Sequence, residues 1–367
     1  MATDVVDGLG VSVFSVPTDG PEADGTLEWS TTTLVLVEVT GAGERSLGYT
    51  YSSPACKPLI DGLLADVVLG RPVLDVGGTT EAMSRAVRNV GRPGLVACAI
   101  SAIDTALWGL KAALLGVPVA GLLGRVHDAV PVYGSGGFTT YDEPTARQQL
   151  EQWVDLWQIP RVKIKIGESW GRRTDRDLDR VVFARRVIGP STELYVDANG
   201  AYTRKQAIRL ARQMADFDVS WFEEPVSSDD LDGLHEVREQ VAADVAAGEY
   251  GYELTYFARM VAAQAVDCLQ VDVTRCGGFT TWLRVAALAA AHGLQVSAHC
   301  APSLHVPVAA AVPNLRHIEL FHDHVRVEHL LFEGTGEPAG GVLRPDPTRP
   351  GIGLDVKRAD AERFRVA

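Results

Sequence analysis

The chain has 367 residues, of which 46% are hydrophobic and 22% are charged, so it is long enough for a barrel together with a smaller domain. Its formal net charge of −13 argues against a nucleic-acid-binding protein, which would carry a basic patch. No segment has the pattern of a secretory signal or a membrane span, and the five cysteines show no CxxC spacing. We therefore expect reduced thiols in a cytoplasmic protein that has no nucleic-acid or membrane partner.

The first 125 residues predict an α+β unit. Runs of β-branched residues indicate two strands and apolar runs indicate three helices, which are expected at 9–16, 30–39, 58–72, 80–91 and 95–116. Two connecting segments, 18–29 and 49–58, are rich in turn-forming residues and are predicted to be loops. The first of these has the composition of a mobile segment.

After residue 125 the chain alternates short apolar strands with amphipathic helices. The expected strands are VPVYGSGG, RVKIKIG, ELYVDANG, VSWFEEP, DVAAGE, CLQVDV, LQVSAH and HIEL. Such alternation predicts a parallel sheet, and eight strands predict a closed barrel over 126–330. The Pro- and Gly-rich segment 331–367 is predicted to return to the unit formed by residues 1–125.

Three acidic residues, Asp197, Glu223 and Glu249, lie at equal intervals of 26 residues, each at the end of a predicted strand. A βα unit has about this length, so the three carboxylates are expected at the same end of neighbouring strands, where barrel active sites lie. Three hard oxygen ligands, with no Cys or His in step, favour Mg²⁺ or Mn²⁺.

Two lysines, Lys163 and Lys165, alternate in the strand VKIKIG and are expected to share its inward face. A buried ammonium is unfavourable unless it is paired, which makes a chance occurrence of two such groups inside a barrel improbable. Each is expected to lower the pKa of the other, so that one becomes a base near neutral pH. The alternative is a pair of surface lysines on an edge strand.

The sixth and seventh strands end in Asp272 and His299, and the eighth ends in Glu319. A carboxylate beside an imidazole fixes its tautomer and raises its pKa, so Asp272 and His299 are a candidate second acid/base pair. The alternative for His299 is a hydrogen-bonded core histidine. Glu319 is a candidate for hydrogen bonding to a substrate oxygen, and the alternative is a salt-bridged glutamate on the barrel rim.

Six further residues are weaker candidates. Three are predicted to bind substrate from the strand ends and loops: Asn199, Arg275 and Lys57. Three others have the chemistry of metal ligands but lie just past the eighth strand, where we expect a solvated loop: His322, Asp323 and His324.

Together these groups place a lysine base and a His–Asp pair on opposite sides of the barrel mouth, with a divalent cation between them. Such a site suits the abstraction of a proton α to a carboxylate, because the cation and a hydrogen-bond donor stabilise the enediolate.

In these motifs the chain resembles the enolase superfamily, and within it the mandelate racemase subgroup, over nearly its whole length. The motifs that carry the resemblance, in order, are AISAIDTALWGLKAALLGVP with LLGR, KIKIG, VDANG, FEEP, GE at 248–249, DVTRCGG, SAHCAP and HIEL. The resemblance implies a (β/α)7β TIM-like barrel with an α+β capping domain whose two N-terminal loops select the substrate. It also implies a homo-oligomer between a dimer and an octamer.

The resemblance implies a role for each residue that matches the motifs of the subgroup. The Mg²⁺ ligands would be Asp197, Glu223 and Glu249. The groups acting on the substrate would be Lys165 as the base for the (S) face with Lys163 as its electrostatic partner, His299 with Asp272 as the acid or base for the (R) face, and Glu319 as a donor to the substrate carboxylate. One departure is Tyr250, which follows Glu249 where several members of the subgroup carry Asn.

The favoured hypothesis for function is an acid-sugar dehydratase that converts an aldonate or aldarate, a small-molecule carboxylate, into a 2-keto-3-deoxy acid. The runner-up is a racemase or epimerase of a 2-hydroxy acid, which would use the same residues without loss of water. Cycloisomerases and dipeptide epimerases are ranked lower, because Arg275 stands where their subgroup carries a lysine base. A silent sugar-acid sensor and a metal-dependent aldolase are rivals from other classes.

Overall fold

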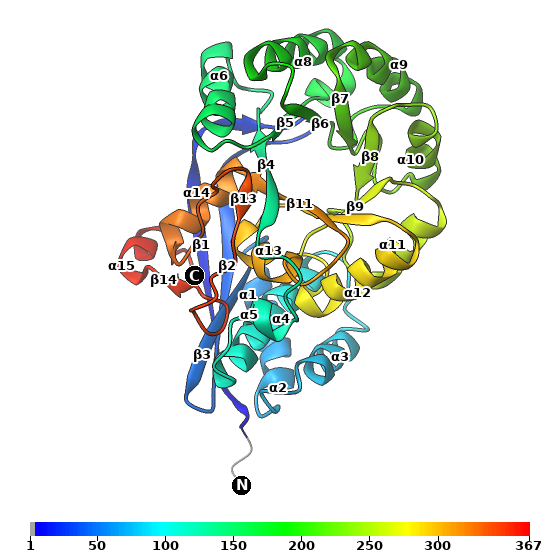
Figure 1. Cartoon of the computed structure of the whole chain (residues 1–367). Helices are drawn as coiled ribbons and strands as arrows, with labels where there is room; N and C mark the ends of the chain where they lie inside the picture. Colours follow the sequence, from blue (N-terminus) through cyan, green and yellow to red (C-terminus); the bar gives the residue numbers. More distant parts are fainter. Residues whose placement is uncertain (1–3) are drawn as a thin grey trace.

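A closed barrel of eight parallel strands forms the larger part of the molecule (Figure 1). The structure is a computed structural model and describes residues 4–367. The strands follow one another in chain order, and β11 closes the barrel by pairing with β4. Their bounds are β4 Val130–Gly136, β5 Arg161–Lys165, β6 Glu193–Asp197, β7 Val219–Glu223, β8 Asp244–Ala247, β9 Cys268–Val271, β10 Gln295–Ala298 and β11 Leu315–Phe321.

Helical connections on the outside of the barrel join each strand to the next (Figure 1). Their main helices are α6 Glu143–Glu151, α8 Thr174–Ile188, α9 Arg204–Met214, α10 Leu231–Arg238, α11 Leu254–Ala262, α12 Gly278–Ala291 and α13 Pro302–Ala309. Seven such connections between eight strands make a (β/α)7β barrel, so the predicted fold class is confirmed.

The alternation of side chains along β5 brings charged groups into the barrel. Lys163 and Lys165 point inward, whereas Val162 and Ile164 pack in the main hydrophobic core. One layer nearer the amino ends of the strands, a cluster of buried aromatic rings fills the interior, made of Tyr133, Tyr195, Trp221 and His317. The inward charged side chains therefore pack on a layer of buried aromatic rings.

The capping domain combines an antiparallel sheet, in the order β1-β2-β3, with a group of helices. Its elements are β1 Val6–Ala23, β2 Glu28–Gly41, β3 Glu44–Tyr51, α1 Cys56–Leu59, α2 Ala65–Val68, α3 Val76–Ala86, α4 Leu95–Leu114 and α5 Val119–Leu122. Helix α4 is long and apolar enough to cross a membrane, but 83% of its apolar window is buried inside the protein. It packs closely on β3, where a Cβ at Gly48 would lie 2.3 Å from the carbonyl oxygen of Ala102. We therefore assign α4 as the core helix of the cap.

The segment 18–29, predicted to be a loop, is the end of a β-hairpin. Strands β1 and β2 stay paired as far as Glu22 with Trp29 and Ala23 with Glu28, after an irregularity that follows Pro17. The prediction is wrong because this pairing depends on cross-strand contacts, which the polar composition does not reveal.

The tip of this hairpin lies against the barrel mouth. Thr139 N–H donates to the carbonyl of Ala23 at 2.9 Å, and Trp170 N–H donates to the carbonyl of Gly25 at 2.9 Å. A Cβ at Gly25 would lie 2.6 Å from the carbonyl oxygen of Ile166, so only glycine fits this approach.

The second predicted loop, 49–58, is also mostly regular. Strand β3, which was not predicted, runs to Tyr51, and α1 begins at Cys56, leaving only residues 52–55 as a turn. At the other end of the chain, Val366 N–H donates to the carbonyl of Val13 in β1 at 2.8 Å. The last residues therefore lie on the cap sheet (Figure 1), while the domain bounds 1–125, 126–330 and 331–367 stay a prediction.

A buried carboxylate joins the cap to the barrel. Asp104 in α4 accepts from the backbone N–H of Thr280 in α12 at 3.0 Å and from its hydroxyl at 2.5 Å. The hydroxyl of Thr80 in α3 donates to the same carboxylate at 2.7 Å. Gly278, with φ +74°, lies against it, since a Cβ there would be 2.3 Å from Asp104 Oδ1. This junction fixes α4 to the barrel helix α12.

Candidate active site

Three carboxylates meet at the carboxyl ends of neighbouring strands. Lys165, Asp197 and Glu223 are in register on β5, β6 and β7. Glu249 follows β8 after Gly248, whose φ is +138°. One oxygen atom from each of Asp197, Glu223 and Glu249 lies within 4.8 Å of the others, and all three residues are buried. The structure thus brings together the three predicted metal ligands.

This cluster suits a hard divalent cation. Among the described residues, Glu249 Oε2 and Asn199 Oδ1 are buried and have no hydrogen-bond partner. Buried oxygen atoms without partners are unfavourable, and a bound cation would satisfy atoms of this kind. A donor set made only of oxygen favours Mg²⁺ over softer metals.

Glu224 is a further buried acid that sequence reasoning missed. It follows Glu223 in the FEEP motif with φ +39°, and its Oε1 has no partner among the described residues. Burial, reinforced by the charges of Glu249 and Asp197, raises the pKa of Glu224 well above its usual value. Its position directly after a predicted ligand was the available signal.

The two lysines are ion-paired inside the barrel. Lys163 Nζ contacts Glu223 and lies 2.8 Å from Glu319 Oε1, while Lys165 Nζ contacts Asp197. Both side chains are buried, so the alternative of surface lysines is wrong. Burial lowers the pKa of Lys165, and Lys163 lowers it further, but the neighbouring carboxylates outweigh both and raise it. With these contacts the pKa of Lys165 is raised, so the prediction of a lysine pKa near neutral is wrong.

His299 and Asp272 come together as predicted, with His299 Nδ1 2.8 Å from Asp272 Oδ2. This contact leaves His299 Nε2 facing the inside of the site, 3.5 Å from Glu249 Oε2. Burial lowers the pKa of His299, but the carboxylates of Glu249, Asp272 and Glu319 outweigh it and raise the pKa. Burial raises the pKa of Asp272, but His299 and Arg275 bring it well below its usual value. The pair therefore favours a protonated imidazole beside a carboxylate.

Arg275 binds protein carboxylates in this structure. Its Nη1 lies 3.4 Å from Glu249 Oε1 and its Nε lies 3.4 Å from Asp272 Oδ2. Its guanidinium also lies 5.4 Å from the ring centroid of Tyr250, which is 42% exposed. Arg275 links the carboxylate cluster to the His–Asp pair, and its predicted contact with substrate stays a prediction.

Several donors hold Glu319, which lies two residues before the end of β11. The hydroxyl of Ser135 donates to it at 2.6 Å and the backbone N–H of Cys300 donates at 2.9 Å. Burial raises the pKa of Glu319, but Lys163 and His299 outweigh burial and hold it well below its usual value. These contacts favour a charged acceptor, whereas the predicted role as a donor requires a proton.

Of the remaining substrate-binding candidates, the structure brings one to the site and leaves one outside it. Asn199 lies beside the cluster, because its backbone N–H donates to Asp197 Oδ1 at 2.9 Å. Lys57 instead lies in the cap, where its Nζ is 3.0 Å from both the carbonyl of Val11 and Asp61 Oδ2. The prediction for Lys57 fails because helix α1 directs the ammonium toward cap residues.

The three residues after β11 do not form a solvated loop. They begin helix α14 (His322–Leu331), and Asp323 and His324 are buried. The ring of His324 stacks on Tyr51 of the cap at a centroid distance of 3.4 Å, and only His322 is partly exposed, with Asp19 3.0 Å away. The prediction is wrong because the partner that buries His324 comes from the distant cap.

A row of aromatic rings connects the hairpin to the site. The ring centroid of Phe321 lies 5.8 Å from Lys165 Nζ. Phe138 packs edge-on against Phe321 with a centroid distance of 5.6 Å, and Trp29 of the hairpin packs edge-on against Phe138 with a centroid distance of 5.5 Å. Trp29 of the cap therefore extends a row of apolar rings that begins on the barrel strands.

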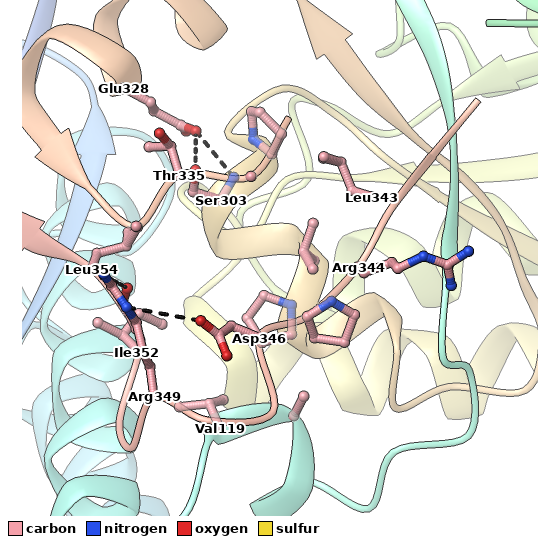
Figure 2. A pocket seen from close by; sticks show the side chains of 18 of the residues that line it. Val119, Ser303, Glu328, Thr335, Leu343, Arg344, Asp346, Arg349, Ile352 and Leu354 are labelled. Atoms are coloured by element: carbon pink, nitrogen blue, oxygen red, sulfur yellow. Dashed lines mark hydrogen bonds and ion pairs between the residues drawn. The ribbon is translucent and has the colours of Figure 1, made fainter. Parts of the chain in front are cut away.

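A cavity of about 280 Å³ lies apart from these residues (Figure 2). Helices α5 and α13 line it together with the C-terminal segment, and Glu328 reaches it from α14. Burial raises the pKa of Glu328 to about 7, and this carboxyl accepts from Tyr49 of the cap at 2.6 Å. No candidate catalytic residue lines this cavity, so we do not place the chemistry there.

Comparison with known families identifies the class of this protein. Residues 10–124 match the mandelate racemase / muconate lactonizing enzyme N-terminal domain, and residues 145–361 match the enolase C-terminal domain-like family. The chain belongs to the enolase superfamily, in the mandelate racemase subgroup. It is an enzyme of that superfamily, whose solved members include Mg²⁺-bound proteins.

Individual relatives have more than one activity. The chain is 32% identical to the 3,6-anhydro-alpha-L-galactonate cycloisomerase of Streptomyces coelicolor, covering 86% of this chain and 87% of the relative. It is 31% identical to the L-talarate/galactarate dehydratase of Salmonella typhimurium, covering 76% and 71%. A solved mandelate racemase/muconate lactonizing enzyme-like protein from Rubrobacter xylanophilus superposes with a TM-score of 0.95 at 48% identity, covering 99% of this chain and 100% of that one.

Proposed function

We propose that this enzyme removes the α-proton of a sugar-acid carboxylate and eliminates the β-hydroxyl, giving a 2-keto-3-deoxy acid. The observation that carries the proposal is the presence of two candidate acid/base groups, Lys165 on β5 and His299 with Asp272 after β10 and β9, around one cluster of carboxylates. The dehydratase among the named relatives supports the same reaction.

The contacts of each residue indicate its role in the proposed reaction. Lys165 or His299 accepts the α-proton, and His299 Nε2 then gives a proton to the departing hydroxyl, which leaves as water. Asp272 holds Nδ1 and keeps the imidazole oriented, while Arg275 holds Asp272 and Glu249 in place. The Mg²⁺ that Asp197, Glu223 and Glu249 would hold supplies positive charge that stabilises the negative charge developing on the substrate.

The protonation states needed for this reaction depend on that charge. The carboxylates that raise the pKa of Lys165 are the same groups that would bind the cation. A divalent cation competes with the ammonium for this negative charge, so its binding favours the neutral lysine that a base requires.

Racemisation or epimerisation of a 2-hydroxy acid is the second candidate. It is favoured by the same pair of groups, because a base on each side of the α-carbon can remove a proton and return one to the opposite face. Cycloisomerisation, ranked low from the sequence, joins these candidates because it is the activity named for a relative at 32% identity.

Several finer points are also proposals. Mn²⁺ can replace Mg²⁺ in a site built only of oxygen ligands. The chain assembles as a homo-oligomer between a dimer and an octamer, and it acts in the cytoplasm. Five buried free cysteines support a reducing compartment.

A substrate screen tests the proposal. Purified protein with Mg²⁺ is incubated with a library of mono- and diacid sugars, and 2-keto acid is read by semicarbazide absorbance. Wells without keto acid are repeated in D₂O and read by proton NMR. A keto acid that has lost the mass of one water establishes dehydration, and a keto acid of unchanged mass points to cycloisomerisation, because elimination of a ring oxygen loses no water. Deuterium at the α-carbon without keto acid establishes racemisation or epimerisation, and silence in all wells contradicts an acid-sugar substrate.

A further inference from the structure

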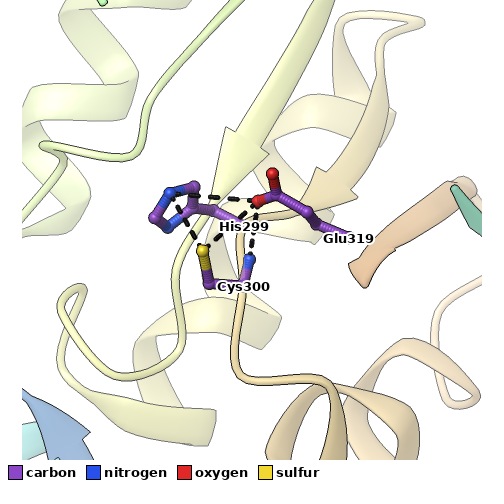
Figure 3. A group of neighbouring side chains, drawn as sticks. All are labelled: His299, Cys300 and Glu319. Carbon is purple, nitrogen blue, oxygen red and sulfur yellow. Dashed lines mark hydrogen bonds and ion pairs between the residues drawn. The ribbon is translucent and has the colours of Figure 1, made fainter. Parts of the chain in front are cut away.

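Cys300 brings a sulfur atom into the candidate active site (Figure 3). Its Sγ lies 3.3 Å from His299 Nε2 and 3.4 Å from Glu319 Oε2, and these two atoms are 3.9 Å apart. All three residues are buried. The backbone at Cys300 has φ +54°, and its N–H donates to Glu319, so the thiol is held between the other two side chains.

The three distances suit a tetrahedral metal. Zinc binds thiolate sulfur at about 2.3 Å, imidazole nitrogen at about 2.0–2.1 Å and carboxylate oxygen at about 2.0–2.2 Å. Tetrahedral angles at these bond lengths separate the donor atoms by about 3.4–3.6 Å. The observed separations of 3.3, 3.4 and 3.9 Å bracket these values, so small side-chain movements would complete the site.

We propose that His299 Nε2, Cys300 Sγ and Glu319 Oε2 form a second metal site, which takes a soft divalent cation such as Zn²⁺. This site differs in chemistry from the cluster of Asp197, Glu223 and Glu249, because a nitrogen and a sulfur donor select Zn²⁺ where oxygen donors favour Mg²⁺. The two sites are neighbours that prefer different ions.

Two surrounding contacts complete the case. Asp272 accepts from His299 Nδ1 at 2.8 Å, which orients Nε2 toward a metal that replaces the proton on this nitrogen, as in carboxylate–histidine–zinc arrangements. Glu249 Oε2 lies 3.5 Å from Nε2 but belongs to the cluster that would hold Mg²⁺, so the fourth position is left to water. A site with three protein ligands and an open fourth position fits four-coordinate zinc.

Binding exchanges protons for the metal. The thiol of Cys300 and the protonated imidazole of His299 each give a proton to the buffer as the sulfur–zinc and nitrogen–zinc bonds form, so two protons are released for each ion bound. Occupation of Nε2 removes the proton carrier from His299. If the proposed function is correct, Zn²⁺ therefore inhibits the enzyme even when Mg²⁺ is saturating.

Cobalt(II) is the probe for the first test, because a thiolate ligand to Co²⁺ gives a near-ultraviolet charge-transfer band. The full chain is kept in excess Mg²⁺ and titrated with Co²⁺. We expect a saturable band at one equivalent in the wild type and in Cys56→Ser, whose thiol lies in the cap near Ser52 and Leu95. We expect no band in Cys300→Ser. A band that persists in Cys300→Ser, or that excess Mg²⁺ abolishes, overturns the proposal.

X-ray absorption at the zinc edge gives a test that needs no variant. Wild-type protein is loaded with one equivalent of Zn²⁺ in the presence of Mg²⁺. The expected result is one sulfur neighbour at about 2.3 Å together with nitrogen and oxygen neighbours. A shell containing only oxygen and nitrogen overturns the proposal. Both measurements read binding without a substrate, so their failure is distinct from failure of the proposed dehydration.

Discussion

Lys165 is the side chain on which the proposed proton abstraction depends most directly. It is only 6% exposed, ends β5 in register with Asp197, and contacts that carboxylate. We expect Lys165→Met, which keeps the length of the side chain and removes its basic nitrogen, to lower turnover by about 10²–10⁴-fold. The measurement is exchange of the α-proton in D₂O, followed by NMR on the substrate that the screen identifies.

The exposed Lys205 of α9 is the matched control for this substitution. Lys205→Met should exchange the α-proton at the wild-type rate. Wild-type exchange in Lys165→Met would remove this lysine from the mechanism and leave His299 as the only candidate base among the described residues.

The residues that sequence analysis missed or misplaced are those whose position depends on tertiary contacts or on the local backbone conformation. The spacing of strand ends predicted Asp197, Glu223, Glu249 and the inward lysines, because strand position alone sets their direction. The burial of His324 depends on Tyr51, far away in the chain, and the placement of Cys300 beside His299 and Glu319 depends on a backbone turn with φ +54°. Neither is visible in a local pattern of apolar and polar residues.

Among the elements, the β1–β2 hairpin carries a buried acid that titrates. Glu22 accepts from Trp29 Nε1 at 2.8 Å, and burial together with the charge of Asp323 raises its pKa to about 8. Because the folded pKa exceeds the unfolded value of 4.5, the stability contributed by this proton is complete below the unfolded pKa. It is lost as pH rises through about 8.

The neutral isostere Glu22→Gln removes this titration. We expect the variant to gain stability relative to the wild type as the pH is raised from about 5 to about 9. The measurement is the midpoint of thermal unfolding across this range. Glu28→Gln, an exposed position on the paired strand, should show no such trend, and a difference between Glu22→Gln and wild type that stays constant with pH would contradict the prediction.

Helix α12 meets the cap at Gly278, where a methyl group has no space. Gly278→Ala places a Cβ 2.3 Å from Asp104 Oδ1 at φ +74°, whereas Gly293→Ala, beyond the other end of α12, meets open space at φ +71°. Both should lose about 1–2 kcal/mol from the positive φ. Gly278→Ala should lose about 1–3 kcal/mol more from the clash. Urea unfolding measures both, and equal losses would argue against a tight junction between α4 and α12.

At the scale of the whole molecule, a cation that binds only the folded chain must stabilise it. Mg²⁺ at about 100 times its dissociation constant should raise the free energy of unfolding by about 2.7 kcal/mol. Glu223→Gln should weaken binding by calorimetry and lose most of this gain, because it removes a charge from the cluster of three carboxylates. Glu143→Gln, exposed on α6, is the control, and a full gain in Glu223→Gln would contradict the ligand assignment.

The architecture was more predictable than the cap in detail. Alternating strands and helices gave all eight barrel strands, since each element has its own local period. In the cap, strand β3 was not predicted and the hairpin tip at 18–29 was predicted to be a loop, because antiparallel pairing joins segments whose composition resembles that of turns. The substrate could not be predicted from the sequence for the same reason, because tertiary contacts place the cap residues near the site.

The closure of the barrel mouth has a consequence for the rate of the enzyme. None of the candidate catalytic groups is more than 6% exposed, so a substrate has to displace part of the cap before it reaches them. The Asp104 junction ties α4 to α12 and opposes a swing of the whole cap, whereas the hairpin tip is held by hydrogen bonds from residues 139, 140 and 170 and by the packing of Trp29 on Phe138. We expect the hairpin tip to act as the gate, and its opening and closing to be a step that can limit turnover when the chemistry is fast.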